Sequence, residues 1–410
     1  MSATKTKLVP ILRFPEFTEP WKTGRVDSFA KRVNNPVAVE PTCMYRQIGV
    51  RSHGKGIFHK EPVTGKSLGD KRVFWVHPQA FVVNIVFGWE QAVALTSAAE
   101  DGFIASHRFP MFVPVDNKAD LDFLLLFFLR KKGKYLLELA SPGGAGRNKT
   151  LGQNEFSKLV MTLPTLSEQQ KIAAFVGAID NKLEALCRKH ELLQSTKRGL
   201  MQKIFSQEIR FNDDDGSNFP DWKKVKFGTV FTRVNRRNVS NCSNVLTISA
   251  QQGLVSQQDF FNKSVASKNV EGYFLLRKGD FAYNKSYSKG YPMGAMKRLS
   301  KYEEGIVSPL YICFSTNKET YAQFYEQYFE SGFLNRELHK IAQEGARNHG
   351  LLNFSVVSFF KEIDIPKPCI KEQQKIADFL STIDAKIDAV AEQIEKMKQF
   401  KKGLLQQMFV

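Results

Sequence analysis

One stretch of the sequence occurs twice, and it limits the possible folds. The first copy begins at Glu168 (EQQKIAAFVGAIDNKLEAL…KRGLMQKIF) and the second at Glu372 (EQQKIADFLSTIDAKIDAV…KKGLLQQMF). The copies align without a gap over about 38 residues, of which about 17 are identical. Apolar residues recur in both at alternating spacings of about three and four, which predicts helices with a narrow apolar seam. We therefore predict two equivalent helices, each about 57 Å long, that pack on each other.

The predicted seam follows every seventh residue in each copy. Its members are Ile172, Ile179, Leu186, Leu193, Leu200, Ile376, Ile383, Val390, Met397 and Leu404. A second row contains Lys197 in one copy and Lys401 at the same place in the other, and polar seam residues fix register at a cost in stability. A lysine interrupts the apolar row at the same place in both copies. This agreement favours two equivalent, paired helices over two unrelated amphipathic helices. The first copy has His190 where the second has Ile394, so the two helices are not equivalent along their whole length.

The segments before the two helices repeat as well. Trp222 corresponds to Trp21, and a glycine-rich turn before Arg-Asn occurs near 147 and 347. Apolar runs such as Phe81–Phe87 and Leu310–Phe314, separated by Gly, Pro and Asn, predict strands between short helices. We predict a mixed α/β fold with two globular domains in tandem, each followed by a spacer helix; the four segments are residues 1–165, 166–208, 209–367 and 368–410. A shared scaffold with different loops suggests two sites of one type.

Composition points to a polyanionic partner. Lys and Arg total 59 against 41 Asp and Glu, which gives a net charge of +18, and nucleic acid is the commonest such partner. The five cysteines are scattered without a CxxC pair, so we expect reduced thiols in a cytoplasmic protein. The longest apolar run, Leu121–Leu129, is too short to span a membrane.

Motifs that carry catalysis are missing from the sequence. Gly65-Lys66-Ser67 has Lys60 where a phosphate-binding loop requires its first glycine. Asn35-Pro36-Val37-Ala38 departs from the Asn/Asp-Pro-Pro-aromatic motif of amino-methyltransferases. The seven histidines show no metal-ligand spacing. We therefore expect no catalytic residues, no metal site and no enzymatic activity in the chain by itself.

The candidate DNA-binding residues lie in basic and aromatic stretches of both halves. The strongest stretch is residues 283–294 (YNKSYSKGYPMG). Its lysines are suited to contacts with phosphates, and its aromatic and hydroxyl groups are suited to contacts with bases and sugars. An ordinary polar connection between strands is the alternative. Arg51 and Gln251 are plausible base readers, since Arg pairs with guanine and Gln with adenine. The full candidate set is Arg46, Arg51, His53, Lys55, Lys66, Lys71, Arg72, Arg147, Asn148, Gln251, Lys285, Ser286, Tyr287, Lys289, Tyr291, Arg347 and Asn348. The repeated Arg-Asn pairs suggest a shared backbone contact or, alternatively, caps.

The sequence resembles the specificity subunits of type I restriction–modification enzymes over nearly its whole length. The features that carry the resemblance are the twin EQQKIA helices with their KRGLMQKIF and KKGLLQQMF ends, the approaches LPTL and IPKPCI, the Gly-Ala turns before Arg-Asn, and the Trp-containing domain starts. The resemblance implies two target-recognition domains, each reading one half of a split, asymmetric DNA sequence. It also implies that the two helices form an antiparallel coiled coil that sets the gap between the half-sites.

The resemblance further implies partners that supply the chemistry. Two modification subunits, with S-adenosylmethionine and the adenine-methylating site, would dock on the helices, and restriction subunits would use ATP and Mg to cut DNA. No cofactor is then expected on this chain. The residues leave two other classes open: an orphan structural or inhibitory scaffold that binds partner subunits, and a self-sufficient DNA methyltransferase or nuclease.

Overall fold

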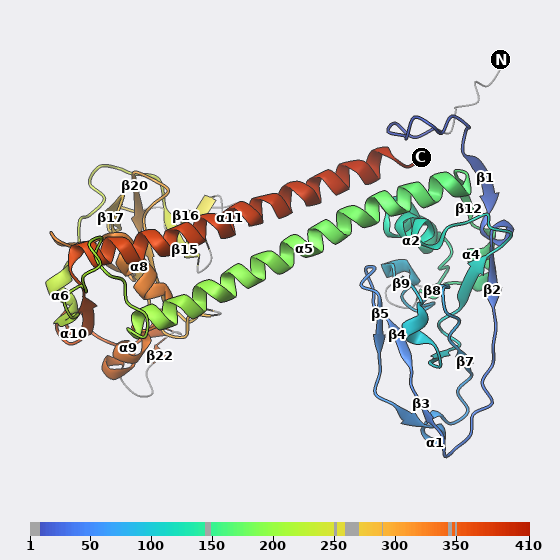
Figure 1. Cartoon of the computed structure of the whole chain (residues 1–410), viewed down its shortest axis with the longest axis horizontal. Helices are drawn as coiled ribbons and strands as arrows, with labels where there is room; N and C mark the ends of the chain where they lie inside the picture. The colour runs from blue at the N-terminus through green and yellow to red at the C-terminus, as the bar shows by residue number, and fades with distance from the viewer. Residues whose placement is uncertain are drawn as a thin grey trace. The chain divides into compact units, whose positions relative to one another are not determined.

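The computed structural model describes residues 9–143, 149–249, 252–258, 270–288, 290–342, 347–348 and 351–410 (Figure 1). Contacts divide the chain into two compact units. Unit 1 comprises Met1–Leu186 and Gln393–Val410, and unit 2 comprises Cys187–Glu392. Each unit therefore combines one globular part with one end of each long helix, whereas the boundaries predicted from the sequence separate the globular parts from the helices.

Unit 1 is built on a four-stranded antiparallel sheet. Its strand order is β2 (Ala30–Val33), β11 (Met111–Pro114), β8 (Phe81–Val83) and β9 (Val93–Leu95). Helices α2 (Leu121–Leu129) and α3 (Lys131–Leu139) follow β11. The smaller elements are the strand pairs β1 (Lys22–Arg25) with β12 (Val160–Leu163), β3 (Met44–Tyr45) with β6 (Val63–Thr64), β4 (Ile48–Val50) with β5 (Ile57–His59) and β7 (Val73–Trp75) with β10 (Ile104–Ser106), and the helices α1 (Gly65–Leu68) and α4 (Gln153–Lys158).

Unit 2 repeats this arrangement. Its four-stranded sheet has the order β14 (Phe231–Arg233), β21 (Ile312–Thr316), β18 (Phe281–Asn284) and β19 (Ala295–Arg298). Helices α8 (Ala322–Glu330) and α9 (Asn335–Ile341) follow β21. The smaller elements are β13 (Lys223–Lys226) with β24 (Asp364–Lys367), β15 (Leu246–Ser249) with β16 (Gly253–Ser256), β17 (Phe274–Arg277) with β20 (Glu304–Val307), β22 (Arg347–Asn348) with β23 (Leu351–Leu352), and the helices α6 (Phe227–Val230) and α10 (Val356–Lys361). The predicted tandem α/β repeat is confirmed.

One predicted strand is shorter than expected. The apolar run Phe81–Phe87 suggested a single strand, but β8 ends at Val83 and the chain turns at Asn84. The side chain of Asn84 accepts a hydrogen bond from the Val86 amide at 3.0 Å, which closes a local turn. Asn favours such turns because its side chain competes with the strand ladder for backbone groups.

The two long helices are α5 (Leu166–Phe205) and α11 (Ile370–Gln407). In unit 1, Lys401 of α11 binds Asp180 of α5 at 2.5 Å. In unit 2, Lys197 of α5 binds Asp384 of α11 at 2.6 Å. Each pair joins the first half of one helix to the second half of the other, so the helices run antiparallel, as the resemblance implied. The two seam lysines therefore have carboxylate partners that the heptad pattern did not reveal.

The seam side chains are excluded from solvent to different degrees. Ile172, Ile179, Leu186, Ile376, Val390 and Leu404 are buried, and Leu193, Leu200, Ile383 and Met397 are half-buried. In unit 1, Ile172 and Leu404 belong to the same aromatic core as Trp21 and Phe123. The helix ends therefore form part of each domain core, and burial of their apolar faces stabilises both at once.

A buried glutamate explains the first residue of the EQQ motif. Glu168 is 1% exposed, and its carboxylate accepts hydrogen bonds from Arg13 at 2.7 Å and from the Trp21 indole at 3.2 Å. In unit 2, the buried carboxylate of Glu372 binds Arg210 at 3.1 Å. A buried carboxylate requires such partners. Glu168 therefore joins the segment before β1 to the start of α5, and Glu372 joins the segment before β13 to the start of α11.

The first glutamine of the motif joins each long helix to a short one. Gln169 is buried; its side chain accepts the Asp120 amide hydrogen at 2.9 Å and donates to the Pro164 carbonyl at 3.0 Å. Gln373 likewise accepts from the Tyr321 amide at 2.9 Å and donates to the Pro368 carbonyl at 2.9 Å. An apolar residue in place of either glutamine would make neither bond. The backbone amide and carbonyl groups that the glutamine contacts would then lose this partner.

We predict that Arg13→Ala lowers the free energy of unfolding of unit 1 by about 3 kcal/mol, because it leaves the buried Glu168 carboxylate without its cation. Denaturant unfolding followed by circular dichroism measures the change. Lys158→Ala is the matched control, since Lys158 and Glu155 form an exposed pair that contributes about 1 kcal/mol or less. Equal effects of the two substitutions would contradict the anchoring role of Glu168.

Candidate nucleic-acid interface

The loops between the last two strands of each sheet are built alike. Loop 1 comprises residues 84–92 between β8 and β9, and loop 2 comprises residues 284–294, from the last residue of β18 to the start of β19. Asn284 accepts the Ser286 amide hydrogen at 3.0 Å, the same bond that Asn84 makes to Val86 in loop 1. The two loops therefore start with the same turn and then differ in sequence and length.

A second shared contact fixes the start of both loops. The Leu151 amide donates to the Ile85 carbonyl at 2.8 Å in unit 1, and the Leu352 amide donates to the Lys285 carbonyl at 3.2 Å in unit 2. Leu352 lies in β23, which pairs with β22, the strand formed by Arg347 and Asn348. The backbone of the predicted Arg-Asn pair thus lies beside loop 2.

An ion pair between a buried lysine and a half-buried glutamate holds the second half of loop 2. Lys297 is 8% exposed and binds Glu330 of α8 at 2.5 Å. The Tyr291 hydroxyl donates to the other Glu330 oxygen at 2.6 Å and accepts from Lys297 at 3.1 Å. Burial, together with the negative charge of Glu330, raises the pKa of Tyr291, so its hydroxyl remains a donor. The polar group of Tyr291 is therefore engaged inside the unit.

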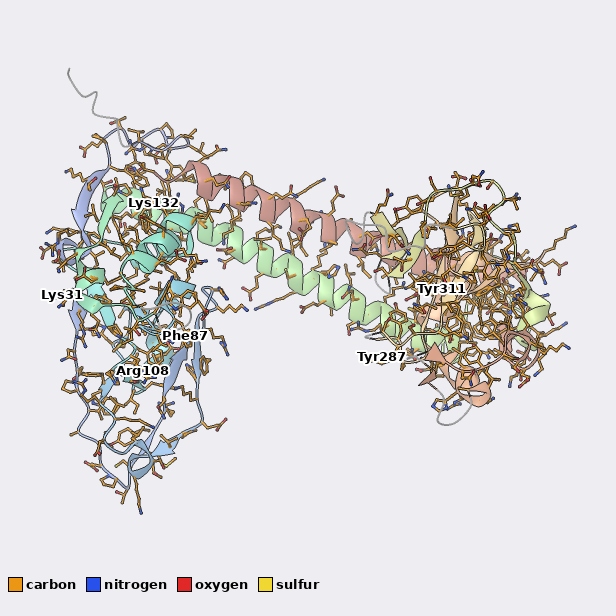
Figure 2. The ribbon with its side chains drawn as sticks, turned by 180° about the vertical axis from the view of Figure 1, so that it is seen from behind. Lys31, Phe87, Arg108, Lys132, Tyr287 and Tyr311 are labelled. Carbon is orange, nitrogen blue, oxygen red and sulfur yellow. The ribbon has the colours of Figure 1, made fainter. Side chains whose placement is uncertain are left out.

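The tip of loop 2 points its aromatic group outward. Tyr287 is 59% exposed (Figure 2). At the end of the loop, the Tyr283 hydroxyl donates to the Met293 carbonyl at 2.6 Å. Gly294 has a φ of +80°, and an added Cβ would lie 2.2 Å from the Asn284 carbonyl oxygen. Only glycine fits this close approach at the base of the loop.

Loop 1 contacts the basic turn predicted from the sequence. The turn joins β4 to β5 and carries Arg51, His53 and Lys55, all exposed. The His53 amide donates to the Glu90 carbonyl at 2.8 Å, and the Ser52 hydroxyl donates to the Glu90 carboxylate at 2.9 Å. These bonds place the cationic turn directly beside loop 1.

Aromatic rings orient several of the predicted cations. The Arg46 guanidinium lies 4.3 Å from the Phe103 ring centroid, and the Arg51 guanidinium lies 4.8 Å from that of Phe58. In unit 2, the Lys285 ammonium lies 5.4 Å from the Phe354 ring centroid. Cations over ring faces are attracted by the ring quadrupole and lose side-chain freedom. These groups are thus partly ordered before any phosphate or base arrives.

The other candidates are distributed as follows. Lys66 is exposed on α1, and Lys71 and Arg72 are exposed in the segment before β7. Arg147, Asn148, Gln251 and Lys289 lie outside the described residues. The roles of all these residues in DNA binding stay predictions.

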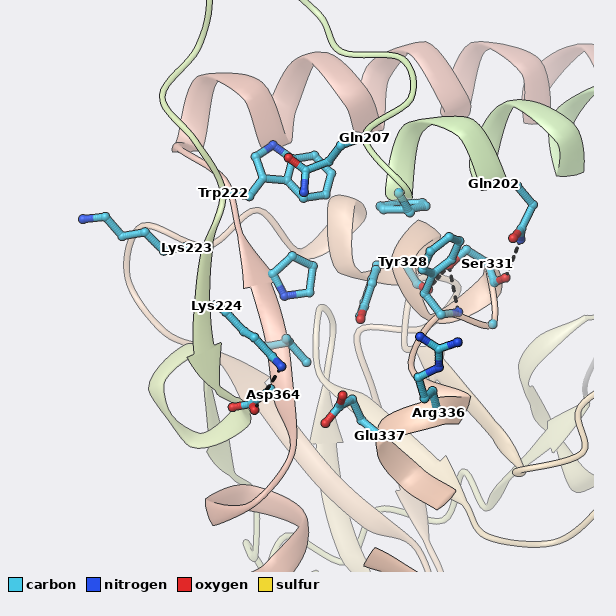
Figure 3. A pocket seen from close by; sticks show the side chains of 15 residues that line it. Gln202, Gln207, Trp222, Lys223, Lys224, Tyr328, Ser331, Arg336, Glu337 and Asp364 are labelled. Carbon is cyan, nitrogen blue, oxygen red and sulfur yellow. Dashed lines mark hydrogen bonds and ion pairs between the residues drawn. The ribbon is translucent and has the colours of Figure 1, made fainter. Parts of the chain in front are cut away.

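A separate pocket of about 520 Å³ lies in unit 2 at the end of α5 (Figure 3). Aromatic side chains of Phe205, Trp222 and Tyr328 form part of its wall, and charges of both signs, such as Arg336 and Glu337, surround it. None of its lining residues belongs to loop 2 or to β22. Because its charges are mixed, the pocket lacks the cationic character that a phosphate-binding surface requires.

The chain carries two copies of one domain, each with a loop that has cationic and aromatic side chains in or beside it, and such groups are suited to contacts with phosphates and bases. The comparisons with known proteins agree. A family model for the type I restriction modification DNA specificity domain matches residues 81–194, which include loop 1. The MjaVIII specificity subunit of a type I restriction enzyme from Methanocaldococcus jannaschii is 24% identical over 311 residues, covering 70% of this chain and 69% of that protein.

Solved structures share the fold. The HsdS subunit from Thermoanaerobacter tengcongensis aligns with a TM-score of 0.53 at 17% identity, covering 97% of this chain and 98% of that one. The S subunit of a type I restriction–modification system from M. genitalium aligns with a TM-score of 0.56 at 15% identity, covering 98% and 99%. The resemblance and the fold predicted from the sequence are therefore confirmed: the chain is similar in sequence to type I specificity subunits and shares the fold of the solved ones.

Among the described residues, no helix has both the length and the apolar character needed to cross a bilayer.

We predict that Glu330→Ala lowers the free energy of unfolding of unit 2 by about 3 kcal/mol, since it leaves the buried Lys297 ammonium unpaired. Urea unfolding provides the measurement. Replacing both Lys297 and Glu330 by Met is expected to recover most of the loss, because no charge then stays buried. Glu303→Ala, which breaks an exposed pair with Lys278, is the control. A double variant as unstable as Glu330→Ala would refute this account.

Proposed function

We propose that this chain is the sequence-specific DNA-recognition subunit of a type I restriction–modification complex, and that each unit reads one half of a split, asymmetric site. The observation that carries the proposal is the duplicated loop. Loops 1 and 2 start from the same turn on the same sheet position but present different side chains. One scaffold with two different loops suits two different half-sites. The family match, which includes loop 1, supports the same role.

DNA binding in this proposal has an unspecific and a specific component. The net charge of +18 attracts the phosphate backbone and makes affinity fall steeply with salt. Side chains of the loops and of the basic turn then contact base edges, which carry the sequence information. The antiparallel helices act as the spacer in this proposal, since the length of the connection between two reading domains limits the distance between the half-sites.

The repeated surface of the long helices supports two equivalent partner sites. Phe175 of α5 and Phe379 of α11 are both exposed and occupy the same place in the two copies. Each packs edge-on against an aromatic residue of the preceding arm, Phe14 at 5.7 Å and Phe211 at 5.4 Å between ring centroids. Two modification subunits of one kind would find the same apolar feature twice. Exposed aromatic groups are favoured at such interfaces.

Catalysis belongs to the partner subunits in this proposal. The modification subunits would bind S-adenosylmethionine and methylate adenine, and restriction subunits would use ATP and Mg to cleave. This chain would contribute recognition and assembly, without a cofactor of its own. The test is selection from a randomised DNA pool with the full chain, alone and with a modification subunit. Enrichment of two sequence blocks at a fixed gap is expected; binding without any sequence preference would leave only a basic scaffold.

We predict that Lys55→Ala weakens binding to all DNA sequences alike and reduces the slope of log affinity against log salt by about 1, because one phosphate contact is lost. Titrations at several salt concentrations measure this slope. Lys158→Ala is the control, since Lys158 lies on α4 in an exposed pair with Glu155 and belongs to neither loop 1 nor the basic turn. An unchanged slope for Lys55→Ala would remove this residue from the interface.

We also predict that inserting seven residues after Leu186 and after Val390 lengthens the gap between half-sites. The two places are equivalent in the repeated helices, and a heptad preserves the seam while adding about 10.5 Å, which corresponds to about three base pairs. Pool selection with the variant measures the new gap. Three-residue insertions at both places are the control, because they turn the seam away from the partner helix. Altered half-sites with an unaltered gap would contradict the spacer role.

A further inference from the structure

Phe87 of loop 1 and Tyr287 of loop 2 occupy equivalent places. Each is the third residue after the asparagine whose side chain closes the turn. Phe87 is 39% exposed and Tyr287 is 59% exposed (Figure 2). The sequence did not single out Phe87, because it ends an apolar run that reads as a buried strand. The structure shows that it lies beyond the strand, in the loop.

The backbone around Phe87 is held on both sides. Its amide donates to the Asn84 carbonyl at 3.1 Å, and its carbonyl accepts from Glu90 at 3.0 Å and from Ala92 at 3.1 Å. Glu90 in turn binds the basic turn through Ser52 and His53. The backbone that carries the ring is therefore held in place beside the turn that contains Arg51, His53 and Lys55. Aromatic groups prearranged in this way lose little freedom on binding.

We propose that Phe87 is a specificity-determining residue of unit 1, and that its ring makes an apolar contact with a base of the half-site which that unit reads. The inference rests on the proposed function. Phe has no hydrogen-bonding group, so its contact is with an apolar feature: the thymine methyl group in the major groove or the face of an unstacked base. Tyr287 adds a hydroxyl at the equivalent place. The two loops thereby select different bases from one geometry.

The experiment compares DNA-pool selection by the full-length wild type with selection by Phe87→Ala, Tyr287→Ala and Tyr135→Ala. Tyr135 is the matched control because it is an exposed aromatic residue of unit 1 on α3. Phe87→Ala is expected to lower selectivity on the order of 10-fold at one or two positions of a single block. Tyr287→Ala is expected to affect the other block, and Tyr135→Ala neither. Circular dichroism and thermal unfolding verify that each variant folds.

Each outcome has a distinct meaning. Wild-type selectivity in both blocks for folded Phe87→Ala would overturn the role of Phe87 while leaving the proposed function intact. Loss of selectivity in both blocks would also overturn it, since a contact made by one unit affects one half-site. If the wild type itself selects no pair of blocks, the proposed function fails and this inference fails with it.

Discussion

The pairing of a buried glutamate with an arginine at the start of each long helix holds each unit together. Glu168 and Glu372 are almost fully buried, and each binds an arginine of the arm that enters the domain. A carboxylate in such a place is costly unless it is paired, and breaking the pair costs more than the pair itself contributes. The arm, the domain core and the start of the helix are therefore held together by this anchor.

The charges in the seam have a different effect from those at the anchors. Lys197 and Lys401 are partly exposed, so their bonds to Asp384 and Asp180 contribute little free energy. Their value lies in specificity: any shift of one helix along the other would leave lysines against apolar neighbours. Polar residues at seam positions fix register and orientation in this way. The domains depend on this register, because the helix ends enter their cores.

The sequence alone predicted the tandem repeat, the helix seam and the basic turn around Arg51, since these depend on periodicity and composition, which are local properties. It could not predict the partners of Lys197 and Lys401 or of Glu168, because those contacts join residues more than a hundred positions apart. Phe87 was missed for a related reason. Its apolar neighbours are typical of a buried strand. The Asn84 side chain closes a turn there, and Phe87 therefore lies on the surface beyond the strand.

The two seam bridges join equivalent residues of the repeat in opposite order: aspartate of the first copy to lysine of the second, and lysine of the first copy to aspartate of the second. A shorter chain with a single copy would carry both groups. Two such chains could form both bridges around a two-fold axis, with one surface serving both sides of the contact. The seam is thus compatible with a symmetric pair of single-copy chains, and joining the two copies in one chain frees each domain to diverge.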